Sequence, residues 1–172
     1  MAAELPRAAA WAYEHTGAPD AWPQALLWAF AHCDERVGEA ELSSALLVAE
    51  GLYVASCGTA RCAVGSVAQG GLLVDEASVA HGAESELEQE RLKGGGPPRH
   101  LPWRGLGGHG LKQQHPGIIG VPDVVRIPPA PSRRLLVLAS EAVWASGARR
   151  PLERAYWALE TGEDGDLWLK RP

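Results

Sequence analysis

The side chains that most often carry out chemistry are sparse in this sequence and poorly spaced for it. His100, His109 and His115 lie in one glycine-rich stretch, but their spacings of nine and six residues match no metal-binding pattern. Cys57 and Cys62 are too far apart for a zinc knuckle and have no histidine at ligand spacing. Ser43, Ser44 and Ser56 have no histidine nearby in sequence, so a nucleophilic triad has no support. We therefore expect no zinc site, and we interpret the three histidines as solvated loop side chains.

Composition indicates a single domain that does not bind nucleic acid directly. The chain has 172 residues, 46% of them hydrophobic, which is enough to bury a real core. Its net charge of -5 lacks the basic face that phosphate binding needs. The three cysteines are an odd and sparse set, typical of an intracellular, reducing compartment, with cytoplasm and organellar matrix both left open.

Neither a membrane span nor a secretory signal is predicted. No apolar run approaches the roughly 20 residues that cross a bilayer. The N-terminus lacks a basic start followed by a purely apolar stretch, so it does not look like a signal peptide.

The chain has seven tryptophans but one phenylalanine. Because tryptophan is large and has a polar edge, we expect some of these side chains to lie where the protein meets a partner.

Two helices are predicted at the start of the sequence. Residues Ala2–His15 place their apolar side chains nearly on one face, and Gly17–Pro19 ends that helix. Asp20 is suited to cap a second helix, with Pro23 in its first turn. This second helix is expected to run to about Val37.

The central stretch predicts closely spaced strands. Ala45–Ala49 and Leu52–Ala55 are separated only by Glu50-Gly51, which is typical of a β-hairpin. A third run, Arg61–Val64, follows a break at Cys57–Thr59, so we predict a three-stranded antiparallel meander. Because these runs are apolar almost throughout, the strands should be covered on both faces.

Further elements follow in the second half of the chain. Strands are expected at Gly71–Asp75, Val124–Ile127 and Arg133–Ser140, and helices at Ser85–Lys93 and Leu152–Leu159. The Gly-, Pro- and His-rich stretch Pro97–Pro122 has no predicted structure, and that length usually means function, a partner or disorder. The predicted core includes Leu46, Val48, Tyr53, Val54, Leu73, Leu135, Val137 and Leu138.

Several of these segments carry a resemblance to a known family. Leu42–Ala45, Tyr53–Ser56 and Gly58–Arg61 match, in order, a Gly-Ser-Thr-Ala strand, an aromatic-Val-Ala-Asn strand and a Gly-Asp-Ser-Arg turn. These motifs are similar to those of the metal-dependent serine/threonine protein phosphatases of the PPM (type 2C) family. Weaker matches continue in the family's order at Asp75, Glu88–Leu92, Trp103–Gly108, Leu138–Ala145 and Asp164–Leu169.

The resemblance implies an α+β fold, an antiparallel β-sandwich flanked by helices and lacking the family's N-terminal strands. It covers nearly the whole chain, so residues 1–172 are expected to form one degenerate phosphatase-like domain. Its parts would be a helical pair at 1–37, a meander at 40–75, a Gly/Pro-rich loop at 97–122, and C-terminal strands with a helix at 123–172.

The resemblance also identifies where the family's metal ligands would fall. Members of the family use two divalent metal ions to activate a water that attacks phosphoserine or phosphothreonine. The corresponding positions here are Thr59, Gly108, Glu141 and Asp164, and a further family Asp is Ala145. The family's first ligands lie in an Asp-Gly-His-Gly-Gly segment before the two helices, where this sequence begins. Hard divalent cations need several carboxylate oxygens, so we regard these positions as vestigial and expect no bound metal and no catalytic residue.

The most direct functional interpretation is a pseudophosphatase that serves as a scaffold or structural subunit of a larger protein assembly. One alternative is a serine/threonine phosphatase whose manganese or magnesium site is completed by a partner chain. Another is an unrelated α+β binding module. We expect contacts with other protein subunits through Trp11, Trp103, Trp168 and the loop around His109. An assembly subunit is preferred over a self-associated dimer, because nothing in the sequence suggests a two-fold patch.

Overall fold

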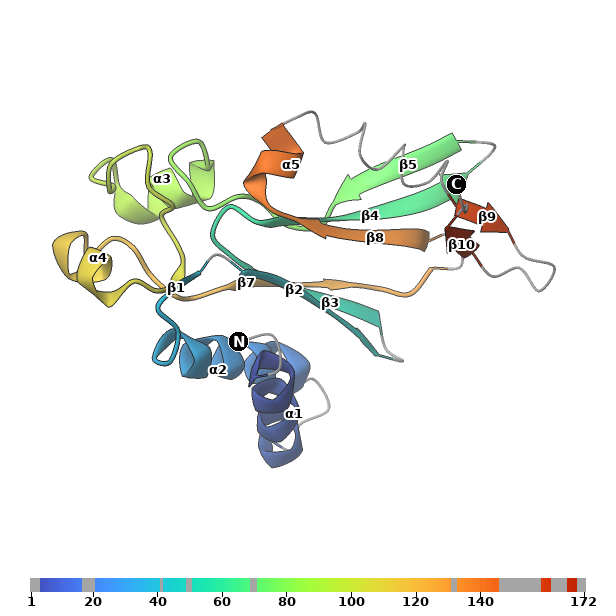
Figure 1. Ribbon diagram of the computed structural model, residues 1–172, viewed down its shortest axis with the longest axis horizontal. Coiled ribbons are helices and arrows are strands. Elements are labelled where there is room, and N and C mark those ends of the chain that lie inside the picture. The colour runs from blue at the N-terminus through green and yellow to red at the C-terminus, as the bar shows by residue number, and fades with distance from the viewer. Residues whose placement is uncertain are drawn as a thin grey trace.

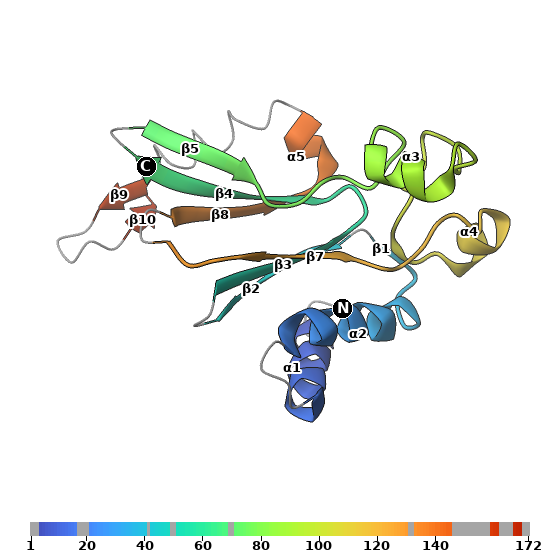
Figure 2. The same ribbon diagram turned by 180° about the vertical axis from the view of Figure 1, so that it is seen from behind.

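The chain folds as two antiparallel sheets that face each other, with helices on their outer faces (Figures 1 and 2). A computed structural model describes residues 4–16, 21–40, 42–48, 51–68, 71–130, 133–145, 159–161 and 167–169. Helices α1 and α2 cover the outside of one sheet, and α5 lies over the other. Helices α3 and α4 lie beyond the same end of both sheets. This is the mixed architecture of helices and antiparallel sheet that the resemblance implied.

The first sheet has the order β2-β3-β7 and contains the predicted hairpin. Strands β2 (Leu42–Val48) and β3 (Gly51–Cys57) pair in the register Val48 to Gly51, and β7 (Asp123–Ile127) pairs with the other edge of β3. All seven residues of β3 are buried, so the expectation of a strand covered on both faces is confirmed for this strand.

The predicted three-stranded meander is wrong, because the chain changes sheets after β3. Strand β4 (Arg61–Ala68) does not pair with β3 and is instead the centre of the second sheet, whose order is β5-β4-β8. Its neighbours are β5 (Gly71–Glu76) and β8 (Arg133–Ala139). A three-residue break alone does not distinguish a hairpin from a corner between two sheets. Here Gly58 turns the corner in the left-handed region, with φ 109°.

The two faces of β3 contribute to two different hydrophobic clusters. Tyr53, Ala55 and Cys57 pack against the helices α1 (Glu4–Thr16) and α2 (Ala21–Asp34). The alternate residues of β3 contribute to a second cluster between the sheets, which contains Leu52, Val54, Cys62, Val64 and Ala77. The two predicted N-terminal helices are therefore present, and the second ends a few residues before the expected Val37.

The predicted core is only partly correct. Tyr53 and Val54 are buried, and Leu135 and Val137 are half-buried in a cluster with Trp144 of helix α5 (Glu141–Ala145). Leu73 and Leu138, however, are 58% and 41% exposed. Both residues lie on the outer strands of the second sheet, opposite Ser66 and Cys62 of β4, and neither belongs to the cluster between the sheets. The side chains of Leu46 and Val48 lie outside the described residues.

The Gly/Pro-rich stretch is ordered, contrary to the expectation of a segment without structure. Strand β6 (Leu106–Gly107) pairs with β1 (Glu39–Ala40), and helix α4 (His109–Gln114) follows directly. Asp34 accepts hydrogen bonds from the Gly107 amide at 2.6 Å and from the Lys112 ammonium at 2.5 Å. Asp34, the last residue of α2, therefore holds both β6 and α4 of the Gly/Pro-rich stretch.

The remaining elements are short. Helix α3 (Glu86–Leu92) is present as predicted, with Ser85 as its N-cap. Strands β9 (Leu159–Thr161) and β10 (Leu167–Leu169) pair with each other. The helix expected at Leu152–Leu159 falls outside the described residues except for Leu159, which begins β9. Within the described ranges, no helix is long and apolar enough to cross a membrane.

Candidate functional site

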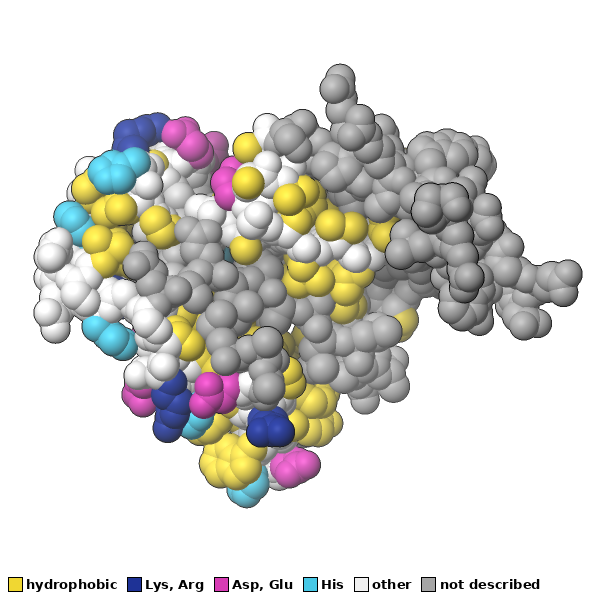
Figure 3. Space-filling model, in the orientation of Figure 1, with side chains coloured by type: hydrophobic (Ala, Val, Ile, Leu, Met, Phe, Trp, Pro, Cys, Tyr) yellow, Lys and Arg dark blue, Asp and Glu magenta, His cyan; other side chains and the backbone are white. Residues whose placement is uncertain are grey.

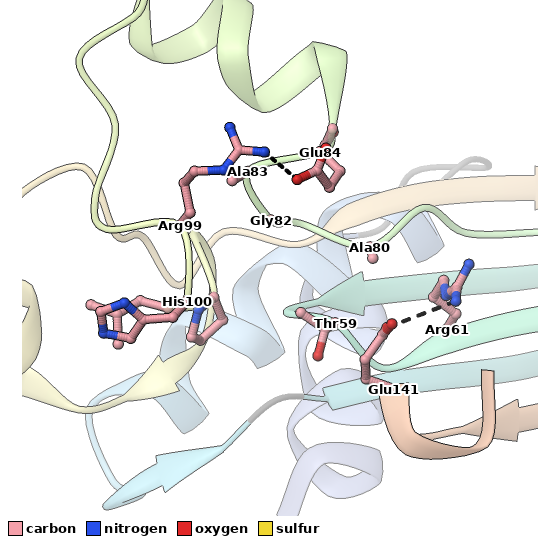
Figure 4. Close-up of a pocket in the computed structure, with 12 residues that line it drawn as sticks. Thr59, Arg61, Ala80, Gly82, Ala83, Glu84, Arg99, His100 and Glu141 are labelled. Carbon is pink, nitrogen blue, oxygen red and sulfur yellow. Dashed lines mark hydrogen bonds and ion pairs between the residues drawn. The ribbon is translucent and has the colours of Figure 1, made fainter. Parts of the chain in front are cut away.

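Two of the four metal-ligand positions expected from the sequence line one cavity. Thr59 follows the end of β3, and Glu141 is the first residue of α5. Together with residues from the segments 80–85 and 99–102 they enclose about 490 Å³ (Figure 4). The fold thus brings the turn after β3 and the start of α5, which are far apart in sequence, together at one end of the sandwich.

The charged groups of this cavity are paired with each other. The Glu141 carboxylate lies 3.8 Å from the Arg61 guanidinium, and Figure 4 shows the two side chains directed toward each other. The same guanidinium lies over the Trp144 ring, 5.4 Å from its centroid. On the opposite wall, Arg99 forms an ion pair with Glu84. Each carboxylate among the described lining residues, Glu84 and Glu141, therefore faces a cation of the protein itself.

The other metal-ligand positions do not complete a site. Gly108 caps α4 in a left-handed conformation and is not part of the cavity lining. Ala145 ends α5 and carries no ligand atom. Asp164 lies outside the described residues. In the part of the chain that is described, no group of three His, Cys, Asp or Glu side chains is placed to hold a metal ion.

A buried ionic network begins on helix α3, whose N-cap Ser85 lines the cavity. Glu88 of α3 is fully buried and accepts four hydrogen bonds, two from Arg91 and two from Arg104, at 2.6–3.0 Å. Burial alone would raise the pKa of Glu88, but the hydrogen bonds from Arg104 and Arg91 outweigh it and keep the pKa below its ordinary value. Glu88 is therefore a charged carboxylate inside the protein.

The network continues through Asp123 to His81. Asp123 accepts hydrogen bonds from Arg104 at 2.7 Å and from His81 Nε2 at 2.9 Å. The His81 hydrogen bond, reinforced by Arg104, lowers the pKa of Asp123 to about 2. On its other side, His81 Nδ1 accepts from the Gly58 amide at 3.2 Å, and the His81 amide donates to the Gly58 carbonyl. His81 thus holds the corner beside Thr59 in place.

Sequence reasoning identified only part of this network. Glu88, Arg91 and Arg104 fell within motifs of the resembling family, although no role followed from their spacing. His81 and Asp123 were missed, because residues 42 positions apart show no local pattern that would connect them.

The residues expected at an interaction surface lie in different environments. Trp11 is exposed, stacks on His15 of α1 and is in tilted contact with Trp28 of α2, and Figure 3 shows hydrophobic side chains and histidine gathered over these helices. His109 is exposed on α4. Trp103 is buried and lies against Gly96, so it offers no surface to a partner. The side chain of Trp168 lies outside the described residues.

Comparison with known proteins identifies what this architecture resembles. A family model described as Protein phosphatase 2C matches residues 31–146. A serine-threonine phosphatase 2C from Toxoplasma gondii is similar in structure, with a TM-score of 0.71 and 19% identity, over 91% of this chain and 66% of that one. A sex determining protein of C. elegans gives a TM-score of 0.71 and 18% identity, over 90% of this chain and 42% of that one. This chain therefore spans less than two thirds of either protein. A search of curated proteins finds no match.

Proposed function

The chain belongs to the protein phosphatase 2C family, and we propose that it is a catalytically inactive member that acts as a subunit of a larger protein assembly. The observation that carries this proposal is the pairing of Glu141 with Arg61 in a cavity whose other metal-ligand position is Thr59. Arg61 competes with a cation for this carboxylate, and one carboxylate offers too few oxygens for a hard divalent ion. Thr59, Gly108 and Ala145 supply no carboxylate at all.

The chemistry of the family supports the same proposal. Metal-assisted attack by water on a phosphate ester requires ligands that hold the ion and lower the pKa of its bound water. One paired glutamate, with Asp164 as the second acidic position, is too small a set for two ions. We accordingly propose that the chain uses no metal cofactor and has no catalytic residue.

The proposed role in an assembly is supported by exposed apolar side chains. The Trp11–Trp28 pair and the exposed Leu73 and Leu138 are apolar groups at the surface. Exposed apolar side chains that gather on one face, as Trp11 and Trp28 do, mark contacts with other proteins. The partners we propose are protein subunits in an intracellular, reducing compartment, which suits the three buried free thiols.

A phosphatase assay tests the catalytic part of this proposal. The purified chain is incubated with a phosphothreonine peptide and millimolar Mn²⁺ or Mg²⁺, and phosphate release is measured beside an active family member. We expect no release above the rate of a heat-denatured sample. Turnover that depends on Mn²⁺ and is lost in Glu141→Gln would contradict inactivity and favour the alternative of a metal-dependent phosphatase.

A mass measurement tests the assembly part. Native mass spectrometry of complexes purified under gentle conditions from the source cell should show the chain bound to other polypeptides in a fixed ratio. A chain recovered only as a cooperatively melting monomer, with no exposed apolar surface by dye binding, would overturn the subunit role.

A further inference from the structure

A second cavity opens between the two sheets, on the side where each described sheet ends. Strand β5 ends one sheet and β7 ends the other, and each has one described neighbour. Between them lies a cavity of about 360 Å³, lined from these strands, from the segment after β5 and from α3. We call it the open-edge groove and define it by Asp75, Val79, Leu87, Asp123 and Val125, among its lining residues.

The strand registers show that this groove is an extension of the hydrophobic core. Val125 lies opposite Val54, and Asp75 lies opposite Val64. Val54 and Val64 belong to the cluster between the sheets, and cross-strand neighbours share a face. Val125 and Asp75 therefore project toward the space between the sheets, yet Val125 remains 43% exposed. The core is uncovered at this edge.

The rim of the groove adds more apolar surface. Val79, in the segment after β5, is 52% exposed, and Leu87 of α3 is 66% exposed. Both line the groove together with Val125. Three aliphatic side chains around one opening form a contiguous patch rather than scattered surface residues.

The charge of the groove is negative. Among the described residues that line it, the ionisable ones are Asp75 and Asp123, and none is Lys, Arg or His. Both carboxylate oxygens of Asp123 are engaged by Arg104 and His81. Asp75 is exposed, and its side chain has no hydrogen-bond or ion-pair partner in the described part of the chain. A ligand that fills the groove is therefore expected to bring a cation to Asp75.

We propose that the open-edge groove binds an extended segment of a partner protein, with apolar side chains at alternate positions and a Lys or Arg that pairs with Asp75. An edge strand directs main-chain N–H and C=O groups outward, and an added strand satisfies them. Alternate side chains of that strand point to one face, where Val79, Leu87 and Val125 form the apolar lining. A second copy of this chain fits less well, because a chain of net charge -5 would approach a negative groove.

The inference rests on the proposed role as a protein-binding subunit, and it names where and how a partner is held. Its failure is distinguishable from failure of the catalytic proposal. Manganese-dependent turnover would contradict the proposed inactivity but would not bear on binding in the open-edge groove. A negative peptide titration would overturn the proposed binding but would not bear on inactivity.

Three fluorescein-labelled octapeptides test the proposal by fluorescence anisotropy with the full chain. The first alternates Val and Lys, the second alternates Val and Glu, and the third repeats the first with methylated backbone amides. We expect the Val-Lys peptide to bind with at least tenfold lower Kd than either of the others. Equal binding of the Val-Glu peptide would overturn the charge assignment, and equal binding of the methylated peptide would overturn strand addition. Absence of saturable binding would overturn the proposal as a whole.

Variants locate the binding. Val79→Ser and Leu87→Ser change exposed residues, so they are expected to fold, and each should weaken Val-Lys binding at least fivefold. Asp75→Asn should reduce the preference for Val-Lys over Val-Glu. The matched control is Val143→Ser in α5, which is 39% exposed and does not line the groove. Equal weakening by the control, with all variants folded by circular dichroism, would contradict the location. Sedimentation showing a dimer that competes with the peptide would assign the groove to a second copy and overturn the partner assignment.

Discussion

Two sets of charged side chains lie at the same end of the molecule and differ in how completely they are paired. Glu88 is fully buried and receives four hydrogen bonds from two arginines. Glu141 is half-exposed and lies 3.8 Å from Arg61, the one cation that pairs with it among the described residues, at the wall of an open cavity. Helix α3 connects them, since Ser85 at its start lines the cavity and Glu88 belongs to the network.

The buried Glu88 network has charges that the fold requires, whereas Glu141 has a charge that a metal site would require. A buried carboxylate is strongly destabilising without partners, so Glu88 depends on Arg91 and Arg104. Carboxylates clustered for metal ions repel each other when the ions are absent. Replacing such positions with Thr59, Gly108 and Ala145 removes that repulsion and leaves the buried network intact. On the proposed interpretation, the family fold persists because the buried network does not depend on the metal ligands.

The largest effect that would test this comparison is expected at Glu88. Glu88→Gln leaves two arginines without a buried counter-charge, and we expect a loss of about 3–5 kcal/mol in the free energy of unfolding. Urea denaturation followed by tryptophan fluorescence measures it. The control is Glu84→Gln, because Glu84 pairs with Arg99 entirely at the surface and should contribute less than about 1 kcal/mol. Similar losses for the two variants would remove the distinction between buried and open charges.

A smaller effect is expected from Asp123 as the pH falls. Its pKa is lowered from 3.8 to about 2 by the His81 hydrogen bond and by Arg104. The folded protein keeps this carboxylate charged where the unfolded chain binds a proton, so the stabilisation is complete above pH 4 and is lost as the pH falls toward 2. Because the side chain is partly exposed, we expect about 1–2 kcal/mol after screening by solvent.

Comparison with Asp123→Asn isolates this contribution. The variant should lose stability at pH 7 and show a smaller further loss between pH 4 and 2 than the parent chain. Urea midpoints across that range provide the measurement. Parallel pH profiles for the two proteins would show that other groups, and not Asp123, govern acid unfolding.

Restoring one carboxylate at the open cavity should have a still smaller effect. Thr59→Asp places a negative charge in the cavity that contains Glu141, and we expect a loss of about 0.5–1 kcal/mol in EDTA. Millimolar Mn²⁺ should recover part of this loss by binding the folded state. Thr59→Asn is the matched neutral control and should not respond to Mn²⁺ in thermal melts. An identical response of the two variants would mean that Thr59 does not face the site its motif implies.

The sequence predicted the family and the local elements better than it predicted the assembly of the sheets. The hairpin of β2 and β3 and helix α3 with its Ser85 cap follow from local signals that the structure keeps. The corner at Gly58 was misjudged, because its direction is decided by contacts with His81, 23 positions away. Long-range contacts of this kind have no local pattern.

The candidate site shows the same limit. The family motifs pointed to Thr59 and Glu141, and the structure places both on one cavity. The motifs also suggested Gly108, which the structure places at the start of α4 instead. Trp103 was expected at the surface because of its residue type, but packing against Gly96 buries it. Residue type predicts what a side chain is able to contact, and only the packing decides whether it does.

The smallest expected effect is at Glu141, and it tests the comparison most directly. In Glu141→Gln, Arg61 loses a half-exposed partner but keeps its place over the Trp144 ring. We therefore expect a change within about 0.5 kcal/mol in the free energy of unfolding, measured beside Glu88→Gln under the same conditions. A loss of several kcal/mol would show that the Arg61–Glu141 pair is a structural contact as important as the Glu88 network. The cavity would then be a closed part of the fold, and its carboxylate would be retained for stability rather than left over from a metal site.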